Sequence, residues 1–194
     1  MKQKTINLYQ FEEITEEQQA QVIEKYRDIN DDTLVLYADD ELCMQEIWES
    51  GFIDAKPCYD LIYSQGGGAC FNCDEFDFDL LLKDWEHKHK NWIVNIIKEH
   101  YQGYIKENRY ANFYSHSKTR YFELEANFNY LYLHIERAIN SAIAHIENLR
   151  YELAESLTNR LYEQLEWFRS DEQIKDTLIA NEYYFNGETL KIEE

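Results

Sequence analysis

The stretch that decides the fold reads Tyr59-Asp60-Leu61-Ile62-Tyr63-Ser64-Gln65-Gly66-Gly67-Gly68-Ala69-Cys70-Phe71. Three of the six glycines in the chain stand together here, between two apolar and aromatic runs. The run before them alternates like a half-buried strand, and consecutive glycines supply the positive φ angles of a tight turn or a bulge. We therefore expect a β-hairpin with strands over 58–63 and 69–78.

Helical patterns flank this hairpin on both sides. Thr15 and Gln18 form a capping-box pattern, which predicts a helix over 15–29. A long helix over 136–168 is predicted because apolar residues recur there every three or four positions, namely Ile139, Ile143, Ile146, Leu149, Leu153, Leu157, Leu161, Leu165 and Phe168. The other expected helices cover residues 33–51, 77–106, with a break near Gly103, and 171–183, with Ser170 as the cap of the last one.

Further strands are expected at both ends and in the middle of the chain. Alternating patterns predict strands over 5–11, 110–116 and 119–134, and Asn186-Gly187 predicts a short terminal hairpin. Strands that cluster between long helices, without regular βαβ alternation, indicate an α+β fold. We expect one domain over 1–194, in which an antiparallel sheet packs against several helices, including the long C-terminal amphipathic helix.

Composition is typical of a folded protein of the cell interior. Of 194 residues, 44% are apolar, enough for one sizeable core. No apolar run approaches the roughly 20 residues of a membrane span, and the N-terminus lacks a signal-peptide pattern. We therefore expect a cytoplasmic protein, with no membrane association and with its four cysteines as reduced thiols.

Charge is the most unusual bulk property. Nineteen basic residues face 38 acidic ones, a formal net charge of −19, and residues 28–86 alone carry a net charge of −14. Such a field repels nucleic acid and attracts basic grooves, which disfavours direct DNA binding and favours a basic nucleic-acid-binding protein as the partner. Solubility alone is the alternative explanation. The expected contact residues are Asp31, Asp32, Asp39, Asp40, Glu41, Glu46, Glu49, Asp74, Glu75, Asp77 and Asp79.

Cofactor and metal patterns are weak. The motif loop Ser64, Gln65, Gly66, Gly67 and Gly68 matches no phosphate-binding motif, and the acids that follow it would repel a phosphate. Cys70 and Cys73 could join His87 and His89 in a zinc site, but a His-x-His on a helix directs its two rings to different faces. Asp74, Glu75, Asp77 and Asp79 lack the arrangement of a calcium loop, so a solvated acidic edge is favoured. We expect no metal and no cofactor.

One segment offers residues for acid–base chemistry. His116, Lys118, Arg120 and Tyr121 lie between two expected strands. In a metal-independent ribonuclease, His116 would be the general base, and Lys118 or Arg120 would stabilise the phosphorane. A polar β-turn is the structural alternative, and it is the one we favour.

Three blocks resemble a family of phage and plasmid proteins. They are Ile14 through Asn30, with its run Glu24-Lys25-Tyr26-Arg27-Asp28-Ile29-Asn30, then Tyr63 through Phe71, and Ala180-Asn181-Glu182-Tyr183 with Phe185. The blocks are similar to proteins labelled "antitoxin of toxin-antitoxin stability system", which carry S-Q-G-D-G-A-x-F in the second block. Gly67 stands where that family usually has Asp. The resemblance implies an accessory protein of a mobile element, acting in the host cell.

Three functions fit these features. The first is an anti-CRISPR-like inhibitor, a DNA mimic whose acidic region occupies the basic nucleic-acid channel of a Cas nuclease and helps its phage to evade host defence. The second is an antitoxin that neutralises a basic toxin. The third is the ribonuclease, acting on guide RNA. Mimicry needs no catalytic residue, so binding is favoured over an enzymatic activity, while the oligomeric state, monomer or dimer, stays open.

Overall fold

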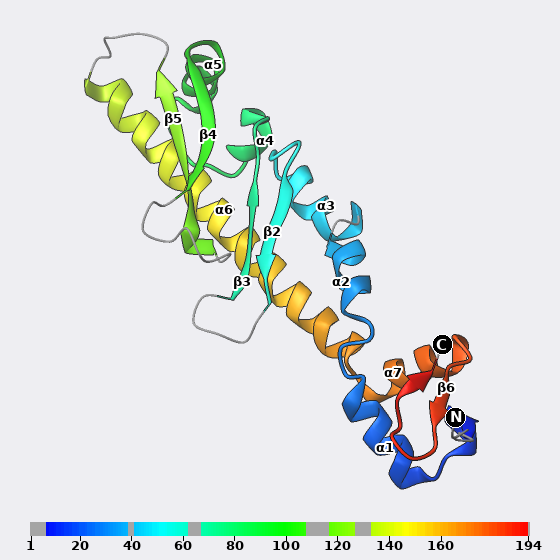
Figure 1. Ribbon diagram of the computed structural model, residues 1–194. Coiled ribbons are helices and arrows are strands. Elements are labelled where there is room, and N and C mark those ends of the chain that lie inside the picture. Colours follow the sequence, from blue (N-terminus) through cyan, green and yellow to red (C-terminus); the bar gives the residue numbers. More distant parts are fainter. Residues whose placement is uncertain (1–6, 39–40, 62–66, 108–116, 127–132, 194) are drawn as a thin grey trace. The chain divides into compact units, whose positions relative to one another are not determined.

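The computed structural model describes residues 7–38, 41–61, 67–107, 117–126 and 133–193. Helices and antiparallel strands make an α+β protein, which confirms the predicted fold class. The chain forms two compact units, described here one at a time: unit 1 comprises residues 1–36 and 163–194, and unit 2 comprises residues 37–162. Helix α6 (Leu133–Phe168) belongs partly to each (Figure 1). The single domain expected over 1–194 stays a prediction.

Unit 1 joins the two ends of the described chain in one small sheet. The sheet is antiparallel, with the order β1 (Leu8–Gln10), β6 (Tyr184–Asn186) and β7 (Ile192–Glu193). Its helical elements are η1 (Phe11–Glu13), α1 (Glu16–Lys25), the first part of α2 (Asp31–Ala38), the end of α6, and α7 (Asp171–Ala180). The core consists of Phe11, Ile14, Val22, Ile174, Leu178, Phe185 and Leu190.

Local capping chemistry sets the helix starts in unit 1 as predicted. Thr15 accepts a hydrogen bond from the Gln18 backbone, and the Gln18 side chain accepts one from the Thr15 backbone, which completes the capping box. Ser170 likewise caps α7 by accepting from the backbone N–H of Gln173 at 3.3 Å. Helix α1 ends at Lys25, whereas the sequence predicted an end at Ile29.

The terminal hairpin is confirmed around Asn186. Phe185 of β6 pairs with Ile192 of β7, and the Asn186 side-chain oxygen accepts the backbone N–H groups of Glu188 and Thr189. A Cβ on Gly187 would lie 2.6 Å from the Tyr9 ring, so a larger residue there would require that ring to shift.

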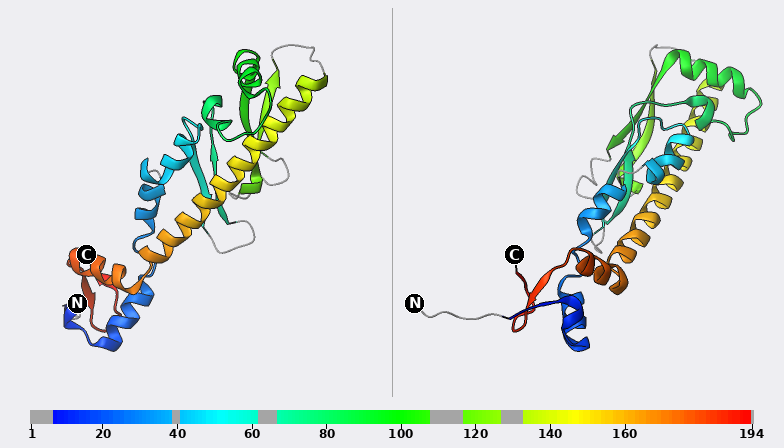
Figure 2. Two further views of the ribbon diagram at one scale, coloured as in Figure 1. Left: turned by 180° about the vertical axis from the view of Figure 1, so that it is seen from behind. Right: turned by 90° about the vertical axis from the view of Figure 1, so that its right-hand side faces the viewer.

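Unit 2 places two separate hairpins along α6, as Figures 1 and 2 show. One hairpin consists of β2 (Lys56–Asp60) and β3 (Gly68–Asn72), and the other of β4 (Tyr101–Glu107) and β5 (Arg120–Ala126). The remaining elements are the end of α2, α3 (Glu41–Glu49), α4 (Phe78–Leu81), α5 (Lys90–His100) and η2 (Ser117–Thr119). The described strands therefore form three small sheets, where the sequence suggested one.

The glycine-flanked hairpin is confirmed. Cys58 pairs with Cys70, and Asp60 pairs with Gly68, which has a φ of 148°. The second strand ends at Asn72, before the predicted end at Phe78. Beyond it, Phe76 makes an isolated antiparallel bridge to Phe52, which ties the chain after the hairpin to the chain before it.

The helix predicted over 77–106 is wrong in two places. After the single turn of α4, the chain is irregular until α5 begins at Lys90, and it leaves helix altogether at Tyr101 to form β4. Gly103, which we expected to break a helix, instead lies within this strand, opposite Leu124. A Cβ there would lie 3.0 Å from the Phe76 ring, so the strand depends on a close approach that glycine permits.

The strand predicted over 119–134 is confirmed only from Arg120 to Ala126. Phe122 and Leu124 are buried while Tyr121 is exposed, which is the predicted alternation. Residues 127–132 lie outside the described chain, and α6 already begins at Leu133. The strand predicted over 110–116 also lies outside the described residues.

Helix α6 confirms the long amphipathic helix, with one exception on its buried stripe. Arg150 is buried, with 1% of its side chain exposed, while the neighbouring Leu149 is only partly buried. The Arg150 guanidinium binds both carboxylate oxygens of Glu147, at 2.8 and 2.7 Å. Glu147 also accepts the backbone N–H of Phe122 at 2.8 Å, so this ion pair attaches β5 to α6.

Candidate functional site

The acidic residues predicted to bind a partner include one compact group in unit 2. A single oxygen of Asp54 accepts the backbone N–H groups of Asp74 and Glu75, both at 2.9 Å, so this carboxylate lies against the turn that carries two further acidic residues. Partial burial acts to raise the pKa of Asp54, but these hydrogen bonds and one from the Cys73 thiol outweigh it and lower that pKa overall. We call Asp54, Asp74 and Glu75 the acidic turn.

No described Lys or Arg forms an ion pair with any carboxylate of the acidic turn. Asp74 and Glu75 are exposed. Asp54 was not among the predicted contact residues. It lies in the short segment between Phe52, which bridges to Phe76, and β2, which pairs with β3. The acidic turn is therefore a charged surface that the described chain leaves unneutralised.

Other predicted contact residues have structural partners. Asp77 caps α4 by accepting the backbone N–H groups of Asp79 and Leu80, and Asp79 forms an ion pair with Lys98 at 2.6 Å. Glu46 pairs with Arg160, and Glu49 accepts a hydrogen bond from Gln45. In unit 1, Asp31 accepts from Arg169 Nε at 2.9 Å, while Asp32 is exposed. Because these carboxylates already have partners in the chain, they attract a basic protein less strongly than the acidic turn does.

Several predicted residues cannot be placed in a site. Asp39, Asp40, Ser64, Gln65, Gly66 and His116 lie outside the described residues, as does the side chain of Glu41. Gly67 is described but belongs to no strand, and β3 begins at the next residue, Gly68.

The basic residues proposed for a ribonuclease take separate positions. Lys118 is exposed in η2, and Arg120 and Tyr121 are consecutive residues of β5, whose side chains point to opposite faces of the strand. Arg120 donates from Nε to the Asn72 side chain at 3.0 Å and from Nη1 to the Thr119 carbonyl at 3.3 Å. The guanidinium thus lies over the β2–β3 hairpin.

Beneath Arg120, two thiols face each other. Cys58 and Cys70 are directly opposite in the β2–β3 register, and we call them the thiol pair. Cys58 is half-buried, and its sulfur lies 3.1 Å from the Asn72 amide nitrogen, whereas Cys70 is fully buried. From the sequence we placed Cys58 only at the start of a predicted strand, as a reduced thiol, and assigned it no chemistry. The expected strands over 58–63 and 69–78 leave a turn over 64–68 with Gly66 at its middle, which would place Cys58 opposite Asp74, so the sequence alone did not pair the two thiols.

The proposed zinc ligands do not converge. Cys73 donates to Asp54 and to the Glu75 carbonyl, and burial, followed by the bond to Asp54, raises the pKa of this thiol to about 12. His87 stacks on Trp85 with ring centroids 4.7 Å apart, and His89 is the N-cap residue of α5, so these histidines precede the helix on which we had placed them. Within the described ranges, no three Cys, His, Asp or Glu side chains are grouped to hold a metal.

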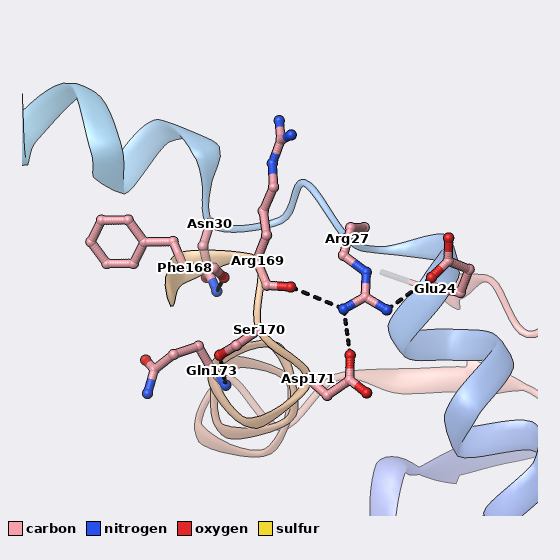
Figure 3. Close-up of polar contacts among 8 residues, drawn as sticks. All are labelled: Glu24, Arg27, Asn30, Phe168, Arg169, Ser170, Asp171 and Gln173. Atoms are coloured by element: carbon pink, nitrogen blue, oxygen red, sulfur yellow. Dashed lines mark hydrogen bonds and ion pairs between the residues drawn. The ribbon is translucent and has the colours of Figure 1, made fainter. Parts of the chain in front are cut away.

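In unit 1, the first resemblance block holds the junction between α6 and α7, as Figure 3 shows. Arg27 Nη1 donates to the Arg169 carbonyl at 2.9 Å and also pairs with Asp171, while Nη2 pairs with Glu24 at 2.8 Å. Asn30, which is 7% exposed, donates to the Phe168 carbonyl at 3.0 Å. These side chains satisfy carbonyl groups at the C-terminal end of α6, which is a structural role.

Two further residues of the same block anchor the terminal strands. Lys25 donates to the carbonyls of Thr189 and Leu190, and the Tyr26 hydroxyl accepts the backbone N–H of Ile192 at 2.8 Å. The Tyr26 ring also packs edge-on against Phe185. The block and the C-terminal segment are therefore parts of one packed unit.

Comparisons with known proteins do not extend this description. No family model, curated protein or solved structure matches the chain. Among the described residues, no helix combines the length and the apolar character required to cross a membrane.

Proposed function

We propose that this chain is a phage- or plasmid-encoded binding protein, which inhibits a Cas nuclease by occupying its basic nucleic-acid-binding surface. The acidic turn carries the proposal, since the Asp54 carboxylate lies there against a turn with two further acidic residues, without an ion-pairing cation in the described chain. The net charge of −14 over residues 28–86 supports it, because the turn lies within the most acidic part of the sequence. The resemblance to phage and plasmid proteins supplies the biological setting.

Such binding would be driven by electrostatic attraction and would depend on salt. Exposed carboxylates attract a basic channel from a distance and compete there with phosphates, so that no covalent step is needed. Salt screens this attraction, with a Debye length of about 8 Å at physiological ionic strength. Affinity for the nuclease is therefore expected to fall steeply as salt increases, and bound DNA is expected to be displaced rather than cleaved.

A displacement assay tests the proposal. A panel of purified Cas nucleases loaded with guide RNA is mixed with fluorescent target DNA, and the full chain is titrated in at low and at high salt. We expect release of intact DNA from at least one nuclease, at chain concentrations that rise with salt. A chain that releases no DNA from any nuclease, or does so equally at both salt concentrations, contradicts the proposal.

Two double variants locate the contact. Asp74→Asn with Glu75→Gln removes two charges from the acidic turn, and we expect affinity to fall about five- to thirtyfold, from roughly 1–2 kcal/mol of lost attraction. Glu123→Gln with Glu125→Gln is the matched control, because it removes the same number of charges from carboxylates that both pair with Lys106. Equal losses in the two variants would assign the effect to net charge and exclude the acidic turn as the contact.

A further inference from the structure

The thiol pair lies on the face of the β2–β3 hairpin that η2 and the start of β5 cover. Directly opposite residues share one face of an antiparallel pair, so the two side chains of Cys58 and Cys70 point to the same side. The Thr119 hydroxyl lies 3.6 Å from the Cys70 sulfur and Arg120 lies beside Cys58. Polar groups of Thr119 and Arg120 thus lie next to the sulfur atoms, although Cys70 itself is fully buried.

Hydrogen bonding fixes the spacing of the pair. The Thr158 hydroxyl accepts the backbone N–H of Ala69 at 2.8 Å and lies 3.2 Å from the Ala69 carbonyl, so the polar groups of Ala69 face away from β2. Since antiparallel pairs alternate, Tyr59 and Ala69 are a non-hydrogen-bonded pair, and Cys58 and Cys70 a hydrogen-bonded one. Their Cα atoms are then about 5.5 Å apart, within the roughly 4.4–6.8 Å span of a disulfide.

The two thiols are chemically unequal. Cys58 is half-buried, accepts a hydrogen bond from the Asn72 amide and lies beside the Arg120 guanidinium, whereas Cys70 is enclosed. Arg120 also donates to Asn72, which fixes the amide that contacts Cys58. A cation and an amide beside an accessible sulfur stabilise a thiolate, the reactive form of cysteine.

We infer that the thiol pair is an oxidation site, at which Cys58 reacts with a hydroperoxide and Cys70 then closes a disulfide between β2 and β3. This inference is independent of the proposed function, since it needs neither the acidic turn nor a protein partner. The site belongs to the class of transient intracellular disulfides formed in response to an oxidant.

The chemistry balances in two steps. The Cys58 thiolate attacks one oxygen of the hydroperoxide, the O–O bond breaks, and the other oxygen leaves as an alcohol or water after taking a proton. The Cys70 sulfur then attacks the resulting sulfenic sulfur, the S–O bond breaks, and that oxygen leaves as water with the Cys70 proton. The two thiols together give two electrons to the peroxide.

The acid–base properties of the pair agree with these roles. A hydrogen bond from the Cys70 thiol, assisted by the charge of Arg120, lowers the pKa of Cys58 to about 6 against the opposing effect of burial. The same hydrogen bond, together with burial, raises the pKa of Cys70 above its usual range. Cys58 is thus the attacking thiolate, while Cys70 keeps its proton until the second step.

Mass spectrometry of the full chain tests the inference. The reduced protein is treated with one equivalent of hydrogen peroxide and then with an alkylating agent. We expect two of the four free thiols to disappear and a Cys58–Cys70 disulfide to form. Chymotrypsin is required for mapping, because no Lys or Arg separates the two cysteines. A disulfide that involves Cys43 or Cys73, or a chain that keeps all four thiols, overturns the inference.

Variants separate the roles of the two thiols. Cys58→Ser should slow thiol loss at least about tenfold, whereas Cys70→Ser should leave a sulfenic acid on Cys58 that a 1,3-diketone probe traps. Cys73→Ser is the matched control and should form the disulfide at the rate of the unmodified chain. Brief alkylation of the unsubstituted protein gives a test without substitutions: Cys58 should be labelled first, and earlier labelling of another cysteine overturns its assignment.

Discussion

Arg27 donates a hydrogen bond at 2.9 Å to the main-chain carbonyl of Arg169, a residue 142 positions later in the chain. The carbonyl belongs to the residue that follows the end of α6, where the helix leaves its last C=O groups without intrahelical partners. The same guanidinium pairs with Asp171, in the first turn of α7. One cation therefore stabilises the end of one helix and the start of the next.

Replacing Arg27 with alanine should destabilise unit 1. The loss of these bonds is expected to lower the free energy of unfolding by roughly 1–2 kcal/mol, because the partners are partly exposed and water replaces some of the contacts. Urea denaturation measures the change. Arg27→Lys keeps the positive charge but not the two guanidinium nitrogens that make these bonds, so it should lose less stability. A lysine variant as unstable as the alanine variant would contradict this explanation.

Asn30 is the second test of the same junction. It donates to the Phe168 carbonyl and accepts from the Thr177 hydroxyl at 2.9 Å, so Asn30→Ala leaves two partly buried groups unpaired. We expect a loss of about 2 kcal/mol in thermal or urea unfolding. A double-mutant cycle with Thr177→Val isolates the second bond, and full additivity of the two changes would show that the two side chains are not coupled.

These polar contacts explain which parts of unit 1 could be predicted. The caps at Thr15 and Ser170 lie within four residues of their partners, so the sequence alone predicts them. Helix α1 ends at Lys25, although the helical spacing of apolar residues continues to Ile29. Beyond that end, Asn30 bonds to the Phe168 carbonyl, 138 positions later, a contact that no local pattern predicts.

In unit 2 as well, contacts between residues close in sequence were predictable, and contacts between distant residues were not. The central hairpin was predictable because its turn glycines and both strands are adjacent in sequence. Strand β4 was missed because its pairing with β5 and the packing of Phe76 against Gly103 are distant in sequence. At the candidate sites, the charge pattern indicated Asp74 and Glu75, but their grouping with Asp54 depends on backbone geometry that only the structure shows.

Gly51 provides a test of backbone geometry at the end of α3. Its φ is 105°, and a Cβ would lie 2.7 Å from the Asp77 carbonyl oxygen and 2.9 Å from the Leu81 side chain. Gly51→Ala should therefore cost roughly 2–4 kcal/mol from strain and close contact together. Ser50→Ala, at the preceding residue, is the control and should cost under about 1 kcal/mol in the same urea titration. Equal stability of Gly51→Ala and the unmodified chain would refute the positive φ.

The buried pair of Glu147 and Arg150 should respond differently to the loss of each partner. Glu147→Ala leaves a buried guanidinium without its carboxylate and should destabilise the protein by roughly 3–5 kcal/mol. Arg150→Met removes the cation and fills similar volume, so its cost should be far smaller. Among the described residues, Arg150 Nη1 has no hydrogen-bond partner, so within this part of the chain the guanidinium is incompletely hydrogen-bonded. Comparable unfolding free energies for the two variants would argue against a desolvated charge.

The reactivity of Cys58 should follow pH with a midpoint near 6. The groups that face its sulfur are Cys70, Asn72 and Arg120, and their net effect lowers the pKa to about 6 from a usual value of 9.0. Its alkylation rate should therefore rise as pH increases through this value and level off above it, since only the thiolate reacts. Arg120→Met removes the cation and should move the midpoint upward. Stopped-flow alkylation of the full chain measures both midpoints, and an unchanged value in the variant would exclude Arg120 as a cause.

The hydroxyl of Thr158 has one more consequence. By occupying the backbone N–H of Ala69, α6 blocks the outer edge of β3 at its centre, where an additional strand would otherwise pair. Unpaired strand edges are templates for intermolecular β-association, and a hairpin rich in buried apolar residues would be especially exposed to it. One threonine on a long helix thus limits the hairpin to two strands and protects the chain from edge-to-edge aggregation.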